Sequence, residues 1–114
     1  MKTTAIPVVK GTLDLLVLKA VSERPLHGFE VTEWIEARSR GRVGFDDSAV
    51  YQSLYRLEKR RHVRAEWGVT ANNRRARYYE LTRAGAKHLK AETARLLRFA
   101  ETMAEILTAP TAAV

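Results

Sequence analysis

Apolar residues recur at helical spacing in three segments of the first half of the chain, which predicts three short helices. The first is expected over 13–23, capped by Thr12, because the proline at position 25 disfavours helical geometry in the residue before it. The second is expected over 26–39, and the third over 46–61 with Asp46 or Asp47 as its cap. Their inward positions are Leu13, Leu16, Val17, Ala20 and Val21, then Val31 and Trp34 or Ile35, and then Val50, Leu54 and Leu57.

Beyond residue 61 the hydrophobic pattern changes to a period of two and later returns to a helical one. Residues 63–67 and 77–81 are predicted to be paired strands. The polar, doubly basic connection over 68–75 is longer than a tight hairpin turn. Thr82 is expected to cap a last helix that continues to about residue 107, with Gly85 weakening its first turn, and residues 108–114 are expected to form a frayed tail.

The last predicted helix would extend about 39 Å, which is longer than a core of this size can cover. Two rows of residues repeat along it at intervals of seven, and such a heptad-like seam is typical of a helix that packs on a partner helix. We therefore expect this helix to pack on a partner helix. The rows are Leu89, Leu96 and Met103 and, offset by four, Thr93, Ala100 and Leu107, while Leu97, Phe99 and Ile106 add a second apolar surface.

The net charge of +7 lies entirely in the second half of the chain. Residues 1–55 hold seven basic and seven acidic side chains, whereas residues 56–114 hold thirteen basic and six acidic ones. Between positions 56 and 77 the count is eight basic to two acidic. A basic block of this kind inside a folded domain favours a polyanionic partner, and a merely solvated basic surface is the alternative.

Several classes of protein are disfavoured by what the sequence lacks. Without cysteine there is no disulfide, thiolate metal site or cysteine nucleophile, which fits a reducing compartment. No apolar run approaches the length of about 18 residues that a membrane span needs, and the first residues do not resemble a signal peptide, so we expect a cytoplasmic protein. The three histidines fall in different elements without close acidic neighbours, and no catalytic motif is present. We expect no metal ion, no cofactor and no enzyme activity.

Three helices, a hairpin with a basic tip and a long helix follow one another in the order of a winged helix-turn-helix. We therefore expect an α+β fold, mainly α with a small β-hairpin. Residues 8–81 would form the DNA-binding domain and residues 82–108 the dimerisation helix. In such a fold the third helix enters the major groove, and the hairpin, called the wing, contacts flanking phosphates.

Five segments resemble the PadR family of bacterial transcriptional regulators, in its short form with a single C-terminal helix. They are 10–18 (KGTLDLLVL), 25–31 (PLHGFEV), 54–58 (LYRLE), 65–68 (AEWG) and 72–82 (NNRRARYYELT). The similarity extends over about 8–107, and the last segment is its most specific part. The resemblance implies a homodimeric repressor that binds a pseudo-palindromic duplex operator and is released by a small apolar or aromatic effector.

By position, the resemblance places the DNA contacts on the third helix and on the wing. The expected set is Ser48, Ala49, Tyr51, Gln52, Tyr55 and Arg56, with Asn73, Arg74 and Arg75. Ala49 stands where the family has a hydroxyl, which Ser48 could supply instead. Asp46-Asp47 replaces an Asn-Pro-Gly-Ser-like start and would repel a phosphate placed near it. Arg61 stands where the family commonly has glycine, so we expect a less sharply formed helix end.

Some of these residues also have a structural interpretation. The wing arginines could belong to a solvated turn, although we favour a phosphate or minor-groove contact. For Gln52 and Arg56 a base contact and an exposed structural role are weighted equally. Tyr51 and Tyr55 can each be half core and half DNA contact, and for Tyr55 the core interpretation is favoured. Arg56 lies one helical turn from Gln52 on the same face.

The seam of the last helix has two interpretations as well. Packing between two copies is favoured over an effector pocket for Leu96, Phe99, Ala100 and Met103. An apolar cavity at that seam would distinguish a ligand-gated repressor. The competing hypothesis is a non-gated, architectural nucleic-acid-binding protein with little sequence preference.

Overall fold

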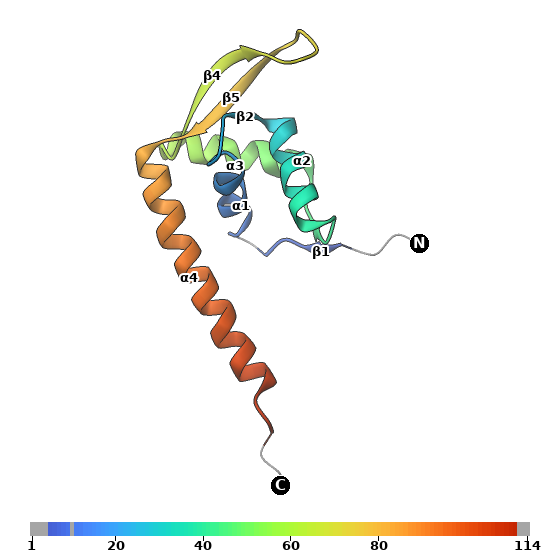
Figure 1. Ribbon diagram of the computed structural model, residues 1–114, viewed down its shortest axis with the longest axis vertical. Coiled ribbons are helices and arrows are strands. Elements are labelled where there is room, and N and C mark those ends of the chain that lie inside the picture. The colour runs from blue at the N-terminus through green and yellow to red at the C-terminus, as the bar shows by residue number, and fades with distance from the viewer. Residues whose placement is uncertain (1–4, 10, 112–114) are drawn as a thin grey trace.

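The computed structural model describes residues 5–9 and 11–111, and it has the expected order of three helices, a hairpin and a long helix. Figure 1 shows the first three helices and a small sheet forming one body, from which the last helix extends. The helices are α1 (Leu13–Ala20), α2 (Gly28–Ser39), α3 (Asp47–Lys59) and α4 (Arg83–Thr108). The strands are β1 (Ile6–Pro7), β2 (Leu26–His27), β3 (Val43–Gly44), β4 (Val63–Val69) and β5 (Arg75–Leu81).

The core lies where α1, α2 and α3 meet one face of the hairpin formed by β4 and β5. The expected inward positions are buried there, except that Leu16 and Trp34 are half-buried. Leu18, Leu26, Val63 and Tyr79 complete the cluster. The helical spacing therefore identified most of the core, and the sheet contributes the rest.

The sheet has three strands in the order β2-β5-β4, all antiparallel. The two long strands extend further toward the hairpin tip than predicted, so the loop comprises only residues 70–74. Backbone bonds from Thr70 N to Arg74 O (2.8 Å) and from Asn73 N to Thr70 O (2.9 Å) close this loop, and Asn73 has a φ of 62°. The strands β1 and β3 form a separate two-residue parallel pair. The sequence pattern indicated none of the two-residue strands, because each is too short to show a period.

The third helix ends sharply at Arg61, contrary to the expectation for a residue that is not glycine. Arg61 adopts the left-handed conformation with a φ of 61°. Its N–H donates to Glu58 O (2.9 Å), and the N–H of His62 donates to Leu57 O (2.9 Å). These two bonds make a Schellman motif, which satisfies the last carbonyl groups of the helix without glycine.

Two of the expected side-chain caps are absent, and one is present. Thr12 precedes α1, but its hydroxyl donates to Val9 O (2.5 Å) instead of accepting from the helix. Asp46 precedes α3 without capping it through its side chain. Thr82 does cap α4, because its Oγ1 accepts from the N–H of Gly85 (3.0 Å).

Gly85 is required by packing rather than tolerated as a weak point of α4. It is buried, and a Cβ built there would overlap the carbonyl oxygen of His62. The start of α4 can therefore press directly on the backbone that joins α3 to β4. At its other end α4 includes Thr108, so the expected tail is shorter by one residue, and positions 112–114 of that tail lie outside the described residues.

Candidate nucleic-acid interface

The exposed face of α3 is a line of four polar or amphipathic side chains opposite the buried stripe. Ser48, Gln52, Tyr55 and Lys59 follow one another at intervals of three or four, and all are exposed. Tyr55 is 62% exposed, so its interpretation as a core residue is wrong. The Lys59 ammonium lies 5.3 Å from the centroid of its ring. Donors, acceptors and a cation therefore line the side of α3 that faces away from the core.

Two of the expected contact residues lie on the flanks of that line. Ala49 is half-buried and packs against the core, so its side chain does not belong to the exposed line. Tyr51 lies on the opposite flank and packs its ring against Gly28 at the start of α2, where a Cβ would overlap it. The ring is still 51% exposed. The interpretation of Tyr51 as half packing and half surface therefore agrees with its position.

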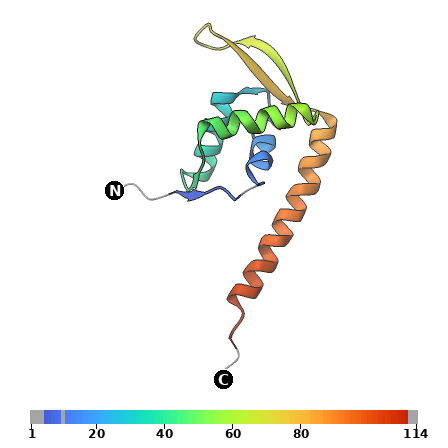
Figure 2. The ribbon, with the colours of Figure 1, turned by 180° about the vertical axis from the view of Figure 1, so that it is seen from behind.

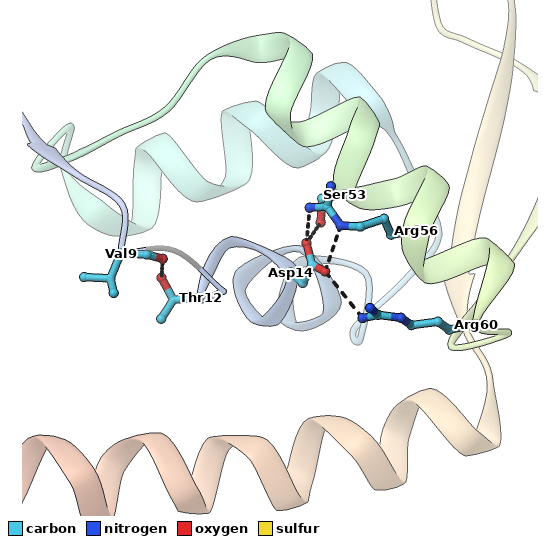
Figure 3. Close-up of polar contacts among 6 residues, drawn as sticks. All are labelled: Val9, Thr12, Asp14, Ser53, Arg56 and Arg60. Atoms are coloured by element: carbon cyan, nitrogen blue, oxygen red, sulfur yellow. Dashed lines mark hydrogen bonds and ion pairs between the residues drawn. The ribbon is translucent and has the colours of Figure 1, made fainter.

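Arg56 is held by α1 (Figure 3). Its Nη2 donates to Asp14 Oδ1 (2.7 Å) and its Nε to Asp14 Oδ2 (3.3 Å). Ser53 Oγ donates to the same carboxylate (2.6 Å), and Arg60 Nη1 lies 3.9 Å from it. Because one edge of the Arg56 guanidinium is occupied in this way, the side chain ties α1 to α3 and is not free to rotate toward the line of Gln52 and Tyr55.

The same contacts explain the acidity of Asp14. Burial by itself raises the pKa of this carboxyl group. Hydrogen bonds from Arg56 and Ser53, with the charges of Arg56 and Arg60, outweigh burial, so the pKa lies below the ordinary value of 3.8. Asp14 is therefore ionised in the folded protein at neutral pH, where it pairs with Arg56 between α1 and α3.

The wing presents its basic residues at and next to its tip. Asn73, Arg74 and Arg75 are all exposed. The Arg75 guanidinium carbon lies 4.5 Å from the centroid of the Trp67 ring on the neighbouring strand. The loop geometry thus places two arginines at the end of a hairpin that rises beside α3 (Figures 1 and 2).

The expected dimer seam on α4 changes from covered to exposed along the helix. Leu89 packs partly on the core and Leu96 is half-buried. Thr93 is also half-buried, whereas Phe99 (62%), Ala100, Met103 (38%) and Leu107 (74%) are exposed. An open groove of about 670 Å³ lies between α1 and α4, with Leu15, Leu18, Leu96 and Phe99 among the residues that line it.

The histidines have closer neighbours than the sequence suggested. His27 caps α2: its Nδ1 accepts from Glu30 N (3.3 Å), and its own N–H donates to Glu30 Oε1 (3.2 Å). His62 and His88 stack with ring centroids 4.3 Å apart. Burial, followed by the charges of His88 and Arg60, holds the pKa of His62 below its ordinary value of 6.5. Within 5–9 and 11–111, no group of three ligand side chains is arranged to hold a metal ion.

Comparison with known proteins assigns the chain to a family. The sequence model of the Transcriptional regulator PadR-like family matches residues 17–91, which is more than half of the chain. The chain belongs to this family. The family is one of transcriptional regulators and not of enzymes, and this PadR-like protein is a DNA-binding transcription regulator.

Solved structures share the fold of this PadR-like protein. A protein of Streptococcus mutans UA159 superposes with a TM-score of 0.81 at 24% identity, covering 97% of this chain and all of that one. A PadR-like transcriptional regulator from Bacillus cereus gives 0.76 at 18% identity over 89% and 96% of the two chains. A Lysinibacillus sphaericus protein described as uncharacterized protein X is 26% identical over 82 residues, 72% of this chain and 75% of that protein. These likenesses confirm the predicted winged-helix architecture.

Three residues of the PadR-like interface were absent from the expected set. Lys59 had a sequence signal, since it continues the spacing of Ser48, Gln52 and Tyr55 by one more turn. Asp14 and Trp67 had none, because their roles depend on contacts with Arg56 and Arg75 across the fold. None of the helices in the described part of this regulator is both long and apolar enough to cross a membrane.

Proposed function

We propose that this PadR-like regulator is a homodimeric repressor that occupies a two-fold symmetric duplex operator. Residues 8–81 form its DNA-binding domain and residues 82–108 its dimerisation helix. The third helix contacts base edges in the major groove through Gln52 and Tyr55, with Lys59 at a flanking phosphate. Asn73, Arg74 and Arg75 contact the phosphates or the minor groove beside it.

The exposed line on α3 is the observation that carries this proposal. A helix fits the major groove only if the side chains on its outer face can reach base edges, and here that face is free of acidic residues from Ser48 to Lys59. The two aspartates at positions 46 and 47 lie at the N-terminal end of α3. Their negative charges interact favourably with the helix dipole there and would repel a phosphate. We therefore place the operator against the middle and C-terminal part of the helix.

The exposed apolar part of α4 supports the dimer. Phe99, Met103 and Leu107 lie beyond the body of the protein and need a cover, which the same segment of a second copy can supply. The groove between α1 and α4 adjoins this seam. A small apolar or aromatic effector bound there would compete with the packing of α4 and release the operator.

Selection from a random duplex pool at near-physiological salt tests the operator proposal. We expect recovery of one sequence with two similar half-sites. Sequence-blind binding that salt removes would favour the architectural alternative and would contradict specific repression.

The variant Leu96→Asp tests the seam. We expect it to convert the dimer to a monomer in sedimentation, and Lys90→Asp, on an exposed position of the same helix, to leave the dimer intact. A stable Leu96→Asp dimer would place the interface elsewhere.

A further inference from the structure

The wing carries an exposed tryptophan that the core does not need. Strand alternation puts Trp67 on the same face of the hairpin as Ala65 and Tyr79, and these two residues already close the core side of the sheet. Trp67 lies further toward the tip and is 60% exposed. A large aromatic side chain beyond the edge of the core needs another explanation than burial.

Two arginines surround this indole. Arg77 is directly opposite Trp67 in the strand register, and Arg75 follows two positions along on the same face. Their guanidinium carbons lie 5.9 Å and 4.5 Å from the centroid of the Trp67 ring. We name Trp67, Arg75 and Arg77 the wing patch.

The two arginines differ in their other partners. Arg77 Nη2 donates to Glu58 Oε2 at 2.8 Å, so Arg77 ties the wing to α3. No carboxylate among the residues that the structure describes pairs with Arg75, and its guanidinium lies over the Trp67 face. A guanidinium that is stacked on an aromatic ring keeps its N–H edge available for a planar acceptor such as a phosphate.

The wing patch lies next to the flank of α3 that carries Tyr51. A cleft of about 340 Å³ lies between them, with Tyr51 from α3 and Trp67 and Arg77 from the wing among its lining residues. A partner seated on α3 therefore meets the wing patch at the same time. The positive charge of the patch and its position beside α3 fit the sugar–phosphate backbone of a duplex.

We propose that Trp67 is a positioning residue for Arg75 in duplex DNA binding. Its ring holds the Arg75 guanidinium in place before DNA binds, with the N–H edge available to a phosphate. The inference rests on the proposed function and adds a residue to it. Since an exposed cation–π contact contributes about 0.5–1 kcal/mol, losing it weakens binding about two- to fivefold for each wing.

A double-mutant cycle tests whether Trp67 acts through Arg75. Labelled duplex is titrated with the full-length protein and with Trp67→Leu, Arg75→Ala and the double variant. We expect Trp67→Leu to weaken binding, Arg75→Ala to weaken it further, and the double variant to bind no worse than Arg75→Ala. Trp67→Phe keeps an aromatic face and should retain most of the affinity.

Arg38→Ala is the matched control, since Arg38 lies 4.6 Å over the ring of Trp34 on α2, a similar pair away from the wing. It removes the same charge as Arg75→Ala, and we expect little change in affinity. Equal losses for the two variants would overturn the proposal. So would Trp67→Leu affinity equal to that of the unmodified protein, or an undiminished Trp67 effect in the Arg75→Ala background.

The intrinsic fluorescence of Trp67 gives a readout that does not depend on folding of the Leu variant. In Trp34→Phe, Trp67 is the remaining tryptophan, and we expect its emission to change as duplex is added. Unchanged emission at saturation, or a larger Trp67→Leu effect on single-stranded than on duplex DNA, would contradict this role. If the unmodified protein binds no duplex, both the proposed function and this inference fail. If it binds duplex but neither the affinity nor the emission depends on Trp67, only the inference fails.

Discussion

The carboxylate of Asp14 on α1 accepts a hydrogen bond of 2.7 Å from the guanidinium of Arg56 on α3, across 42 positions of sequence. Ser53, buried on α3, donates to the same carboxylate, so two successive turns of α3 are fixed against α1. The orientation of α3 relative to the body is thereby set by polar contacts as well as by the packing of Leu54 and Leu57.

Replacing Asp14 by asparagine should therefore destabilise the protein by about 1–2 kcal/mol, after allowance for the partial exposure of the arginines. Since the pKa of Asp14 is lowered in the folded state, its contribution is complete above the ordinary value of 3.8 and is lost as the pH falls through the lower folded-state value. Urea unfolding of both proteins over this pH range measures the difference. Glu33→Gln, an exposed neutralisation on α2, is the control and should change little; a constant Asp14→Asn deficit at all pH values would contradict the ion pair.

Gln52 and Lys59 should contribute to DNA binding in different ways. Gln52→Ala removes a side chain that can pair with a base edge, so we expect relaxed preference at one operator position and an otherwise similar site. Lys59→Ala removes a phosphate contact, so affinity should fall for all duplexes and the salt slope should fall by about one. Competition titrations at several salt concentrations separate the two effects. A uniform loss of affinity for all duplexes in Gln52→Ala would indicate that Gln52 contacts the DNA backbone and not a base.

Gly85→Ala provides a test of packing against propensity. Helix propensity alone predicts that alanine stabilises an interior helical position by up to about 1 kcal/mol. The structure predicts the opposite sign, because the new Cβ would overlap the His62 carbonyl oxygen and force α4 away from the end of α3. We expect a loss of more than about 2 kcal/mol in thermal or urea unfolding. Any gain in stability would show that α4 does not press on this backbone.

The histidine pair His62–His88 should make stability depend on pH. Because the pKa of His62 is lowered in the folded state, the unfolded chain takes up a proton first as the pH falls. The contribution of neutral His62 to stability is therefore fully present at pH values above its ordinary pKa of 6.5. It decreases as the pH falls from there to the lower pKa of the folded state. His62→Gln should remove this part of the decline in unfolding free energy, and His88→Gln should reduce it by removing one repelling charge. An identical decline in all three proteins would contradict burial of His62.

Local pattern was sufficient for the element order, because the helical and strand periods are long enough to be recognised in α1 to α4 and in β4 and β5. It was insufficient where the structure depends on contacts between distant residues. The four additional wing residues in the strands are an example, since Gly68 and Val69 look like a loop until they pair with Ala76 and Arg75. Arg56 is another, because its spacing on α3 matches a surface residue and only the fold brings Asp14 to it.

The candidate site, too, could be predicted from local pattern only in part. The exposure of Ser48 and Gln52 follows from helical spacing, so it could be predicted along with the exposed wing tip, whereas Tyr55 was expected in the core and is exposed. The position of Ala49 could not, because half-burial on the flank depends on how closely α3 packs on the body. The pairing of Trp67 with Arg75 requires the strand register, which no local pattern specifies.

A footprint of the protein on its selected duplex tests the central claim most directly. We predict two protected segments related by a two-fold axis, with centres about one helical turn or a multiple of it apart. Each should have a major-groove patch for α3 and an adjoining backbone segment that loses protection in Arg75→Ala. A single asymmetric segment, or uniform protection along the duplex, would contradict a dimer that reads an operator through α3 and the wing.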